Sequence, residues 1–428
     1  MAELRLTSGV TPLDEAQLPE AWQAKRLLDF CSFAQGGRLG LTKQDHYRTT
    51  GIPAFSAAGQ DGFVDAVEFR NTDAVVLSAI GANCGRCFLA SGDWTTLANI
   101  QAVIPEVGEA DARFLHYRVN RDDYWPRSGS AQPFIKPSDM KSCWVALPPL
   151  PQQTLIADVL DTLDTTIRRT EAIVAKLKLV KQGLLHDLLT RGIDAYGELR
   201  PPQSQAPHLY KPSPLGWIPR EWGVTSIGEL ADMLVGLAFD SVRFTTSQDG
   251  VRLLRGINVS RGFIRWSESI TARWPRSDRS ITRYLLSEGD VVIGMDGALV
   301  GRNVAIVRDE DLPCVLVQRV ARLRAQEPIS SWLKMNIQHQ RFLAHIDGVK
   351  THTAIPHITG GNIFEYTVAQ PPSGEIVSGT ERIGAIESRI GAEQRELSQL
   401  SKLKSGLMDD LLTGRVRVTP LLEAAAAP

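Results

Sequence analysis

The stretch GLLHDLLT at residues 183–190 returns 223 positions later as GLMDDLLT at residues 406–413. The same offset holds upstream, where seven apolar positions of the first copy meet seven apolar positions of the second. These pairs are Leu160 with Ile383, Leu163 with Ile386, Ile167 with Ile390, Val174 with Leu397, Leu177 with Leu400, Val180 with Leu403 and Leu184 with Leu407. The chain therefore carries one long helical segment twice.

The spacing of these apolar residues alternates mostly between three and four, which is typical of the seam of a coiled coil. A helix from about residue 152 to 190 would be roughly 58 Å long at 1.5 Å per residue. We predict that the two helices pack on each other; the alternative is that each lies on its own domain. The residues expected at the helix pair or at a partner interface are Leu160, Leu163, Ile167, Val174, Leu177, Leu184, Ile383, Ile386, Ile390, Leu397, Leu400 and Leu407.

The duplication extends beyond the helices. LPEAW at 18–22 resembles IPREW at 218–222, and DAVVLSAIGANCGRC at 73–87 resembles GDVVIGMDGALVGRN at 289–303. SAQPFI at 130–135 aligns with TAIPHI at 353–358, and a Pro-Pro pair precedes each helix. The helices repeat well whereas the domains before them repeat poorly, which indicates a shared scaffold that carries two different binding domains.

The predicted fold class is α+β: two mixed α/β domains joined by two long coiled-coil-forming helices, an internal tandem duplication with pseudo-two-fold character. Short apolar runs followed by glycine-rich turns indicate mixed strands with a few short helices. The expected segments are domains at 1–150 and 217–373, helices at 151–193 and 374–415, an extended Pro-rich linker at 194–216, and a flexible tail at 416–428.

Composition sets broad limits on the class of protein. The 428 residues are 43% apolar and 22% charged, with 47 basic against 48 acidic residues, so any nucleic-acid surface must be local. We expect no signal peptide, because the N-terminus lacks an apolar core of the required length, and no run approaches the length of a membrane span. Five cysteines fit a reducing compartment. We expect a cytoplasmic protein with no membrane partner.

Catalytic signatures are missing from the sequence. It has no phosphate-binding Gly-x-x-x-x-Gly-Lys-Ser/Thr loop, no Gly-x-Ser-x-Gly turn and no Asn/Asp-Pro-Pro-aromatic motif. Cys84 and Cys87 form a C-x-x-C, but the second copy keeps only its Gly-Arg turn, so redox chemistry or a zinc site is not expected. The histidines at 339, 345, 352 and 357 match no ligand spacing. We expect no catalytic residue, no metal and no cofactor in this chain.

One segment is strongly basic. Residues 250–283 contain eight arginines, no lysine and two acids, a local net charge of +6. Arginine suits bidentate contact with phosphate or with guanine edges. The alternative is a solvated surface. The related region of the first half is less basic and holds Arg38, Lys43 and Arg48.

Two unlike domains, each opened by Pro-x-x-Trp and closed by Pro-Pro, are each followed by a helix ending in Gly-Leu-x-x-Asp-Leu-Leu-Thr. In these motifs the chain resembles the specificity subunits of type I restriction–modification systems, over nearly its whole length. The second copy departs from the family's Pro-x-x-Gln-Gln pattern and has PPSGEIVSG at 371–379.

The resemblance implies a non-catalytic subunit whose two target-recognition domains each read one half of a bipartite site in double-stranded DNA. It also implies two adenine methyltransferase subunits and two restriction/translocase subunits as partners. S-adenosylmethionine, ATP and Mg would then belong to the partner subunits. Two alternatives stay open: a specificity subunit of a methyltransferase-only system, and a coiled-coil scaffold that binds ligands other than DNA.

Residues that contact DNA are expected in the basic segments and in two aligned loops. The loops are those that contain SAQPFI and TAIPHI, because their alignment suggests a common DNA-facing position. The predicted DNA-binding residues are Arg38, Lys43, Arg48, Ser128, Ser130, Arg252, Arg255, Asn258, Arg261, Lys350, Thr351 and Thr353.

Overall fold

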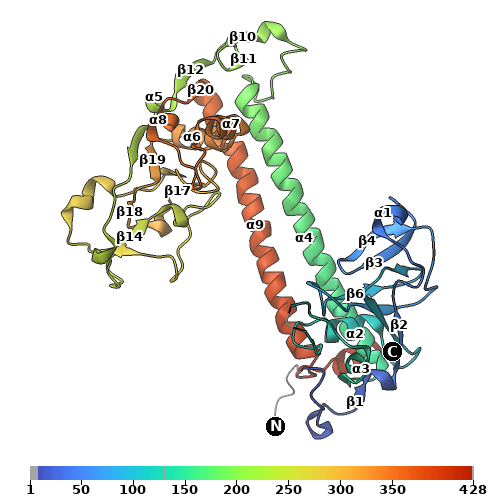
Figure 1. Cartoon of the computed structure of the whole chain (residues 1–428). Coiled ribbons are helices and arrows are strands. Elements are labelled where there is room, and N and C mark those ends of the chain that lie inside the picture. The colour runs from blue at the N-terminus through green and yellow to red at the C-terminus, as the bar shows by residue number, and fades with distance from the viewer. Residues whose placement is uncertain (1–7, 130, 427–428) are drawn as a thin grey trace. The chain divides into compact units, whose positions relative to one another are not determined.

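The computed structural model describes residues 8–129 and 131–426, and it divides into two compact units (Figure 1). The first unit comprises residues 1–172 and 394–428, and the second comprises residues 173–393. Two long helices, α4 (Leu150–Thr190) and α9 (Ser373–Leu411), each contribute one part to each unit. Within the described residues, no helix has the length and apolarity needed to cross a membrane.

The first unit contains three small sheets with the strand orders β2-β8-β5-β6, β4-β3-β7 and β1-β9. Its strands are β1 (Gln23–Arg26), β2 (Cys31–Gln35), β3 (Ile52–Ser56), β4 (Gly59–Val64), β5 (Ala74–Ser78), β6 (Cys87–Ala90), β7 (Thr95–Thr96), β8 (Ile100–Pro105) and β9 (Trp144–Leu147). Its shorter helices are α1 (Lys43–His46), α2 (Ala112–Val119), α3 (Pro137–Lys141) and α10 (Thr419–Ala426).

The second unit has sheets with the orders β13-β19-β16-β17, β15-β14-β18 and β12-β20, and a separate hairpin β10-β11. Its strands are β10 (Tyr210–Ser213), β11 (Gly216–Pro219), β12 (Gly223–Ser226), β13 (Asp232–Val235), β14 (Val251–Leu254), β15 (Arg273–Trp274), β16 (Val291–Gly294), β17 (Val304–Ile306), β18 (Cys314–Leu316), β19 (Val320–Arg324) and β20 (Thr367–Gln370). Its shorter helices are α5 (Ile227–Leu230), α6 (Ile329–Gln338), α7 (Gln340–Val349) and α8 (Gly360–Phe364).

The two domains share one topology despite their dissimilar sequences. In both four-stranded sheets all neighbours are antiparallel. In both three-stranded sheets the middle strand has one antiparallel and one parallel neighbour. The pairs β1-β9 and β12-β20 join the start of each domain to its end. The predicted α+β class, with two mixed domains and two long helices, is confirmed.

The core of each domain follows from alternation along one central strand. In β5, Val75 and Leu77 pack in a cluster with residues of α2 and α4, whereas Ala74 and Val76 pack in another cluster that includes Trp94. In β16, Val291 and Ile293 face the cluster that contains α6 and α7 residues, and Val292 faces the opposite one. A strand buried on both faces reads as a continuous apolar run, as VVL and VVI do.

Several segments differ from the sequence expectation. The linker expected to be extended at 194–216 contains strand β10 and the start of β11, because Tyr210 packs its ring into the unit and pairs with Pro219. In the tail expected to be flexible, Val418 is buried and α10 follows it. The long helices end at Thr190 and Leu411, earlier than expected.

Candidate nucleic-acid and partner interfaces

The basic segment of the second domain divides into two kinds of arginine. Three arginines donate to backbone carbonyl oxygens: Arg252 to Glu310 and Leu312, Arg255 to Ile270, and Arg273 to Gly250. The Arg252 guanidinium also lies 4.6 Å from the centroid of the Trp266 ring. These three side chains are half-buried and fasten β14 and β15 to the loops beside them. Sequence alone could not separate these arginines from solvated ones.

Asn258 has no exposed surface, contrary to its prediction as a DNA-binding residue. Its side-chain amide oxygen accepts from the Arg255 backbone N–H, and its side-chain amide nitrogen donates to the backbone carbonyl oxygens of Arg265 and Ile270. A buried polar side chain needs such partners. The bond from the Arg255 N–H ties the Asn258 side chain to the residue that precedes the short 3-10 helix Gly256–Asn258, so the role of Asn258 is structural.

The other five arginines of the segment are exposed: Arg261, Arg265, Arg276, Arg279 and Arg283. Arg265 and Arg276 each donate to a backbone carbonyl, at Ile257 and Asp249. Among the residues that the structure describes, none of the five has a carboxylate within ion-pair distance. These five arginines therefore carry positive charge that no carboxylate of the described residues pairs with, and only Arg261 of the five was a predicted DNA-binding residue.

The predicted DNA-binding cations of the first domain are exposed but mostly paired. Lys43, at the start of α1, forms an ion pair with Asp61. Arg48 lies 3.2 Å from the Asp65 carboxylate, and Arg38 donates to the Gln35 carbonyl oxygen. All three residues precede β3, whereas the basic segment begins at β14, the equivalent strand of the second domain, and continues beyond it, so these cations are not its structural counterparts.

The aligned loops have the same backbone hydrogen bonds in both domains. The Gly81 N–H donates to Pro133 and the Ile135 N–H to Ala79; in the second domain Gly297 donates to Pro356 and Ile358 to Met295. These four bonds confirm the alignment of SAQPFI with TAIPHI. The Gly-Arg turns also match, since Gly81 and Gly297, like Gly85 and Gly301, have positive φ.

Side chains on these loops are mostly engaged within the chain. Ser128 is half-buried, and its backbone N–H donates to Phe134. Thr351 contacts His357 at 3.0 Å, Thr353 is exposed, and Lys350 pairs with Asp347. Arg302 and Lys350 together hold the pKa of the Asp347 carboxyl at about 2. The predicted residue Ser130 lies outside the described residues.

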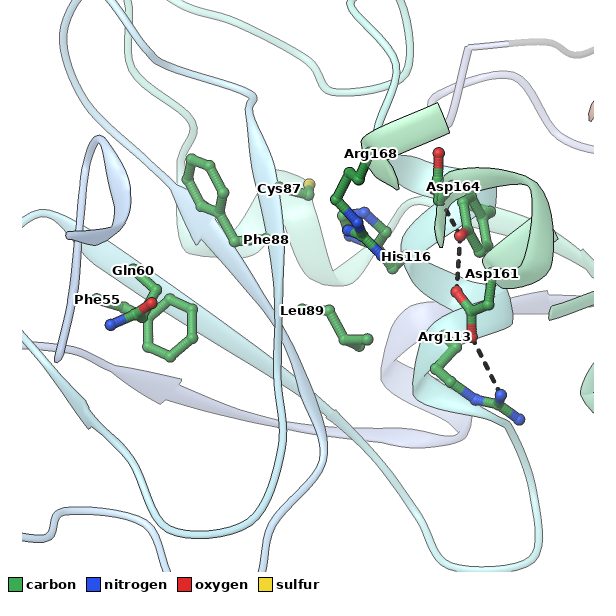
Figure 2. Close-up of a pocket in the computed structure, with 11 residues that line it drawn as sticks. Phe55, Gln60, Cys87, Phe88, Leu89, Arg113, His116, Asp161, Asp164 and Arg168 are labelled. Atoms are coloured by element: carbon green, nitrogen blue, oxygen red, sulfur yellow. Dashed lines mark hydrogen bonds and ion pairs between the residues drawn. The ribbon is translucent and has the colours of Figure 1, made fainter. Parts of the chain in front are cut away.

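A cavity of about 360 Å³ opens in the first unit between β6, α2 and α4 (Figure 2). Phe55, Phe88 and Leu89 line it from the sheets, and His116 and Arg168 from the helices. Burial lowers the pKa of His116 to about 4, and its Nδ1 has no hydrogen-bond partner among the described atoms. The imidazole is therefore neutral at pH 7.

No metal site is formed by the described residues, because no group of three His, Cys, Asp or Glu side chains converges. Cys87 is buried, accepts from the Trp125 indole N–H at 3.2 Å, and has its pKa raised by burial to about 12. His345 contacts the Asn362 carbonyl, and His339 contacts His186 at 3.3 Å. These side chains are structural.

Some of the predicted seam residues lie in apolar clusters to which both long helices contribute. In the first unit, Ile156 and Leu160 of α4 share a cluster with Leu407 and Leu411 of α9. In the second unit, Leu185 and Leu188 share a cluster with Ile376 and Ile383. The pairing is antiparallel in each unit. Of the twelve predicted seam residues, Leu160, Val174, Ile383 and Ile390 are buried and the rest are half-buried.

One apolar pair of the repeat is not in the seam. Val180 and its equivalent Leu403 are 47% and 50% exposed. Three residues further on, Gly183 and its equivalent Gly406 are exposed, and a Cβ added to either would meet nothing. Glycine inside a helix costs about 1 kcal/mol relative to alanine. Neither glycine is explained by packing within the chain.

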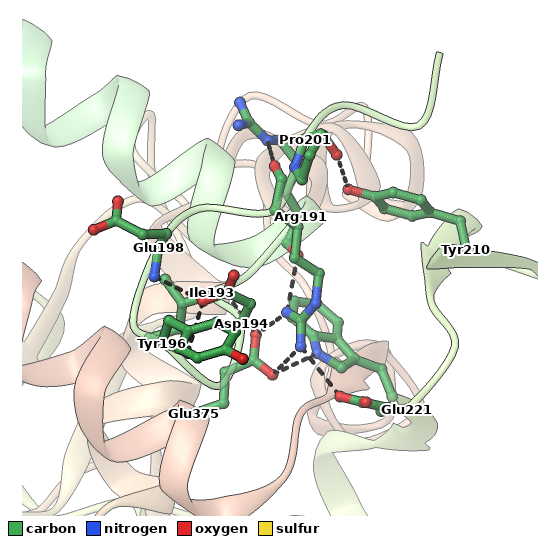
Figure 3. Close-up of polar contacts among 11 residues, drawn as sticks. Arg191, Ile193, Asp194, Tyr196, Glu198, Pro201, Tyr210, Glu221 and Glu375 are labelled. Carbon is green, nitrogen blue, oxygen red and sulfur yellow. Dashed lines mark hydrogen bonds and ion pairs between the residues drawn. The ribbon is translucent and has the colours of Figure 1, made fainter. Parts of the chain in front are cut away.

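The entry of each helix is tied to the tryptophan that opens the same domain. In the first unit the Trp22 indole N–H donates to Gln152 at 3.3 Å. In the second unit Trp222 donates to Glu375 at 3.0 Å. Figure 3 shows Glu375 among its polar contacts. Gln152 and Glu375 occupy the same position of the repeat, so the departure of the second copy from Gln-Gln preserves the hydrogen bond.

Unlike the glutamine at the equivalent position, the Glu375 carboxylate carries a charge that must be compensated when it is buried. Arg200 donates to both Glu375 oxygens, at 2.5 and 3.1 Å, and the Ile193 N–H adds a bond of 2.7 Å. Both charged side chains are only 9% exposed. A buried carboxylate needs this compensation. The second junction is thus a buried ion pair where the first is a neutral hydrogen bond.

Comparisons with known proteins agree with this architecture. The family model described as the type I restriction modification DNA specificity domain matches residues 19–179. The chain is 24% identical to the type I restriction enzyme MjaVIII specificity subunit of Methanocaldococcus jannaschii, over 95% of both chains. It is 34% identical to the EcoAI specificity subunit of Escherichia coli over 33% of this chain and 24% of that protein.

A solved structure has a similar fold. The crystal structure of the type I restriction–modification system S subunit from M. genitalium matches with a TM-score of 0.62 and 13% identity, over 95% of this chain and 99% of that one.

Arg200→Leu is expected to destabilise the second unit by about 3–5 kcal/mol, because it leaves the Glu375 carboxylate buried without its cation. The double variant Arg200→Leu/Glu375→Gln should recover most of this loss, since it recreates the neutral junction of the first unit. Glu221→Gln is the control: its exposed carboxylate contacts the same arginine and should cost less than about 1 kcal/mol. Denaturant unfolding measures all three. Equal stability of the single and double variants would contradict the account.

Proposed function

Because the chain belongs to the family of type I restriction–modification specificity subunits, we propose that each of its domains reads one half of a bipartite DNA target. The observation that carries this proposal is the shared topology with different surface chemistry. The same strand order recurs in both domains, yet the exposed arginines of the second domain have no counterpart of equal charge in the first. Two domains of one design with different surfaces suit two different half-sites.

The helix pair suits such a target. Proteins that read two half-sites commonly do so about one helical turn apart, ~34–36 Å. Packed helices hold a distance better than a flexible linker, and each unit contains both helices in contact. We therefore propose that the helices set the number of base pairs left unread between the halves.

We also propose that the helices recruit two adenine methyltransferase subunits, and through them two restriction/translocase subunits. Each long helix has an exposed apolar side chain followed three residues later by an exposed glycine, at equivalent positions of the repeat. These residues are Val180 with Gly183 and Leu403 with Gly406. A close approach by a partner backbone would explain the glycines. S-adenosylmethionine, ATP and Mg would be bound by the partners, which supply methyl transfer, translocation and cleavage.

The first experiment is to co-express the chain with the adenine methyltransferase encoded beside it and to map modified adenines across the host DNA. We expect the two proteins to co-purify and to modify a split motif, with one adenine in each half. Modification confined to one contiguous site, or its absence in a complex that does co-purify, would contradict bipartite reading.

A second experiment locates the reading surface of the second domain. Once the motif is known, Arg261→Ala, Arg279→Ala and Arg283→Ala complexes are titrated with duplex DNA at several salt concentrations. Loss of a phosphate contact should lower the slope of log K against log salt by about 0.9, and loss of a base contact should cost about 1–3 kcal/mol and relax one half-site. Arg308→Ala, an exposed arginine paired with Glu310, is the matched control. Wild-type behaviour of all three variants would place the surface elsewhere.

A further inference from the structure

The two long helices carry one polar contact that occurs in both units. In the first unit the Asp164 carboxylate of α4 accepts from Lys404 of α9 at 2.5 Å. In the second unit the Glu387 carboxylate of α9 accepts from Lys181 of α4 at 2.6 Å. Asp164 and Glu387 are separated by the repeat offset of 223, and so are Lys181 and Lys404. The duplicated helix therefore forms the same ion pair twice.

Each of these carboxylates also contacts a polar group from the domain of its own unit. The Tyr117 hydroxyl of α2 lies 2.8 Å from the second oxygen of Asp164. The Lys334 ammonium of α6 lies 2.6 Å from the second oxygen of Glu387. Helices α2 and α6 occupy the same place in the two domains, after β8 and β19, and both contact the four-stranded sheet. In each unit one carboxylate thus joins three elements: both long helices and the domain.

These contacts are partly buried, so that solvent does not fully screen them and they can fix the position of the domain. The charged side chains at the two points are 17–28% exposed, and Tyr117 is buried. Burial opposes ionisation of Glu387, but the Lys334 and Lys181 ammonium groups outweigh it and lower its pKa. Burial and the two neighbouring aspartates raise the pKa of Tyr117, so its hydroxyl stays a donor. Glu387 therefore stays ionised and paired at neutral pH.

We infer that Asp164 and Glu387 are positioning residues, which fix each recognition domain on the helix pair and thereby fix the spacer between the two half-sites. The inference rests on the proposed bipartite reading of DNA. Neither carboxylate needs to contact bases for this role. Each acts by holding its domain at one angle to the helices, so that only one separation of half-sites fits both reading surfaces.

The two carboxylates differ in how many other polar contacts hold their domain to the long helices. In the first unit Tyr117 also contacts Asp161 at 2.7 Å, and Arg113 pairs with Asp158 and Asp161, so the domain keeps other polar contacts with α4. The repeat equivalent of Asp161 in the second unit is Gly384, which offers no side chain. The second domain keeps contacts with α4 between Lys181 and Gln338 and between His186 and His339, but neither is an ion pair. Because Glu387 accepts from both Lys181 and Lys334, its loss should loosen the domain more than loss of Asp164 alone.

The test maps modified adenines in cells that express variant chains with the methyltransferase. Glu387→Gln should retain both half-site sequences but modify motifs whose spacer is one base pair longer or shorter about tenfold more often than the wild type does. Lys334→Ala should do the same, and Lys334→Arg should keep the wild-type spacer. Asp164→Asn should show a smaller effect. Glu381→Gln, an exposed carboxylate of the same helix, is the matched control.

The outcomes separate the two proposals. If the wild-type complex modifies no split motif, the proposed function fails. If the wild type modifies a split motif and Glu387→Gln keeps one spacer at an undiminished level, the positioning role is wrong. A purely structural role would lower modification at every site without changing the distribution of spacers, and that result would overturn the inference as well.

Discussion

The structure depends on the register in which a duplicated helix meets its own copy. Antiparallel pairing of two equivalent helices makes each contact return at the equivalent position, as Asp164 with Lys404 and Lys181 with Glu387 show. One set of residues, written twice by the duplication, therefore specifies the packing in both units. The apolar seam supplies most of the stabilisation, and the ion pairs select the register because a shift would leave half-buried charges unpaired.

The two domains close in the same way although their sequences are dissimilar. Each returns its last strand to its first, through β1-β9 and β12-β20, so the chain enters its long helix beside the tryptophan that opened the domain. Trp22 with Gln152 and Trp222 with Glu375 complete this closure. Surface residues between these fixed points are free to differ. This freedom explains how two domains with dissimilar sequences keep one strand order.

Much of this was readable from sequence, for physical reasons that can be named. The helix seam, the Pro-x-x-Trp entries and the Gly-Arg turns each depend on a residue type that the backbone or the packing requires, and each was recognised. The structural roles of the arginines could not be predicted from the sequence. A guanidinium that binds a backbone carbonyl oxygen, as that of Arg252 does, leaves no local sequence pattern. Tyr117 and Lys334 were also missed, since unlike residue types make the comparable contact in the two units. Which residues contact DNA stays a prediction.

The central claim is that the helix pair sets the separation of the two half-sites. The direct measurement inserts one heptad after Ala172 and one after Arg395, equivalent positions of the repeat, and maps modified adenines with the methyltransferase present. Seven residues add roughly 10 Å of helix, or about 3 base pairs at 3.4 Å each. The account predicts unchanged half-sites and a longer spacer. An unchanged spacer in an active complex would contradict it.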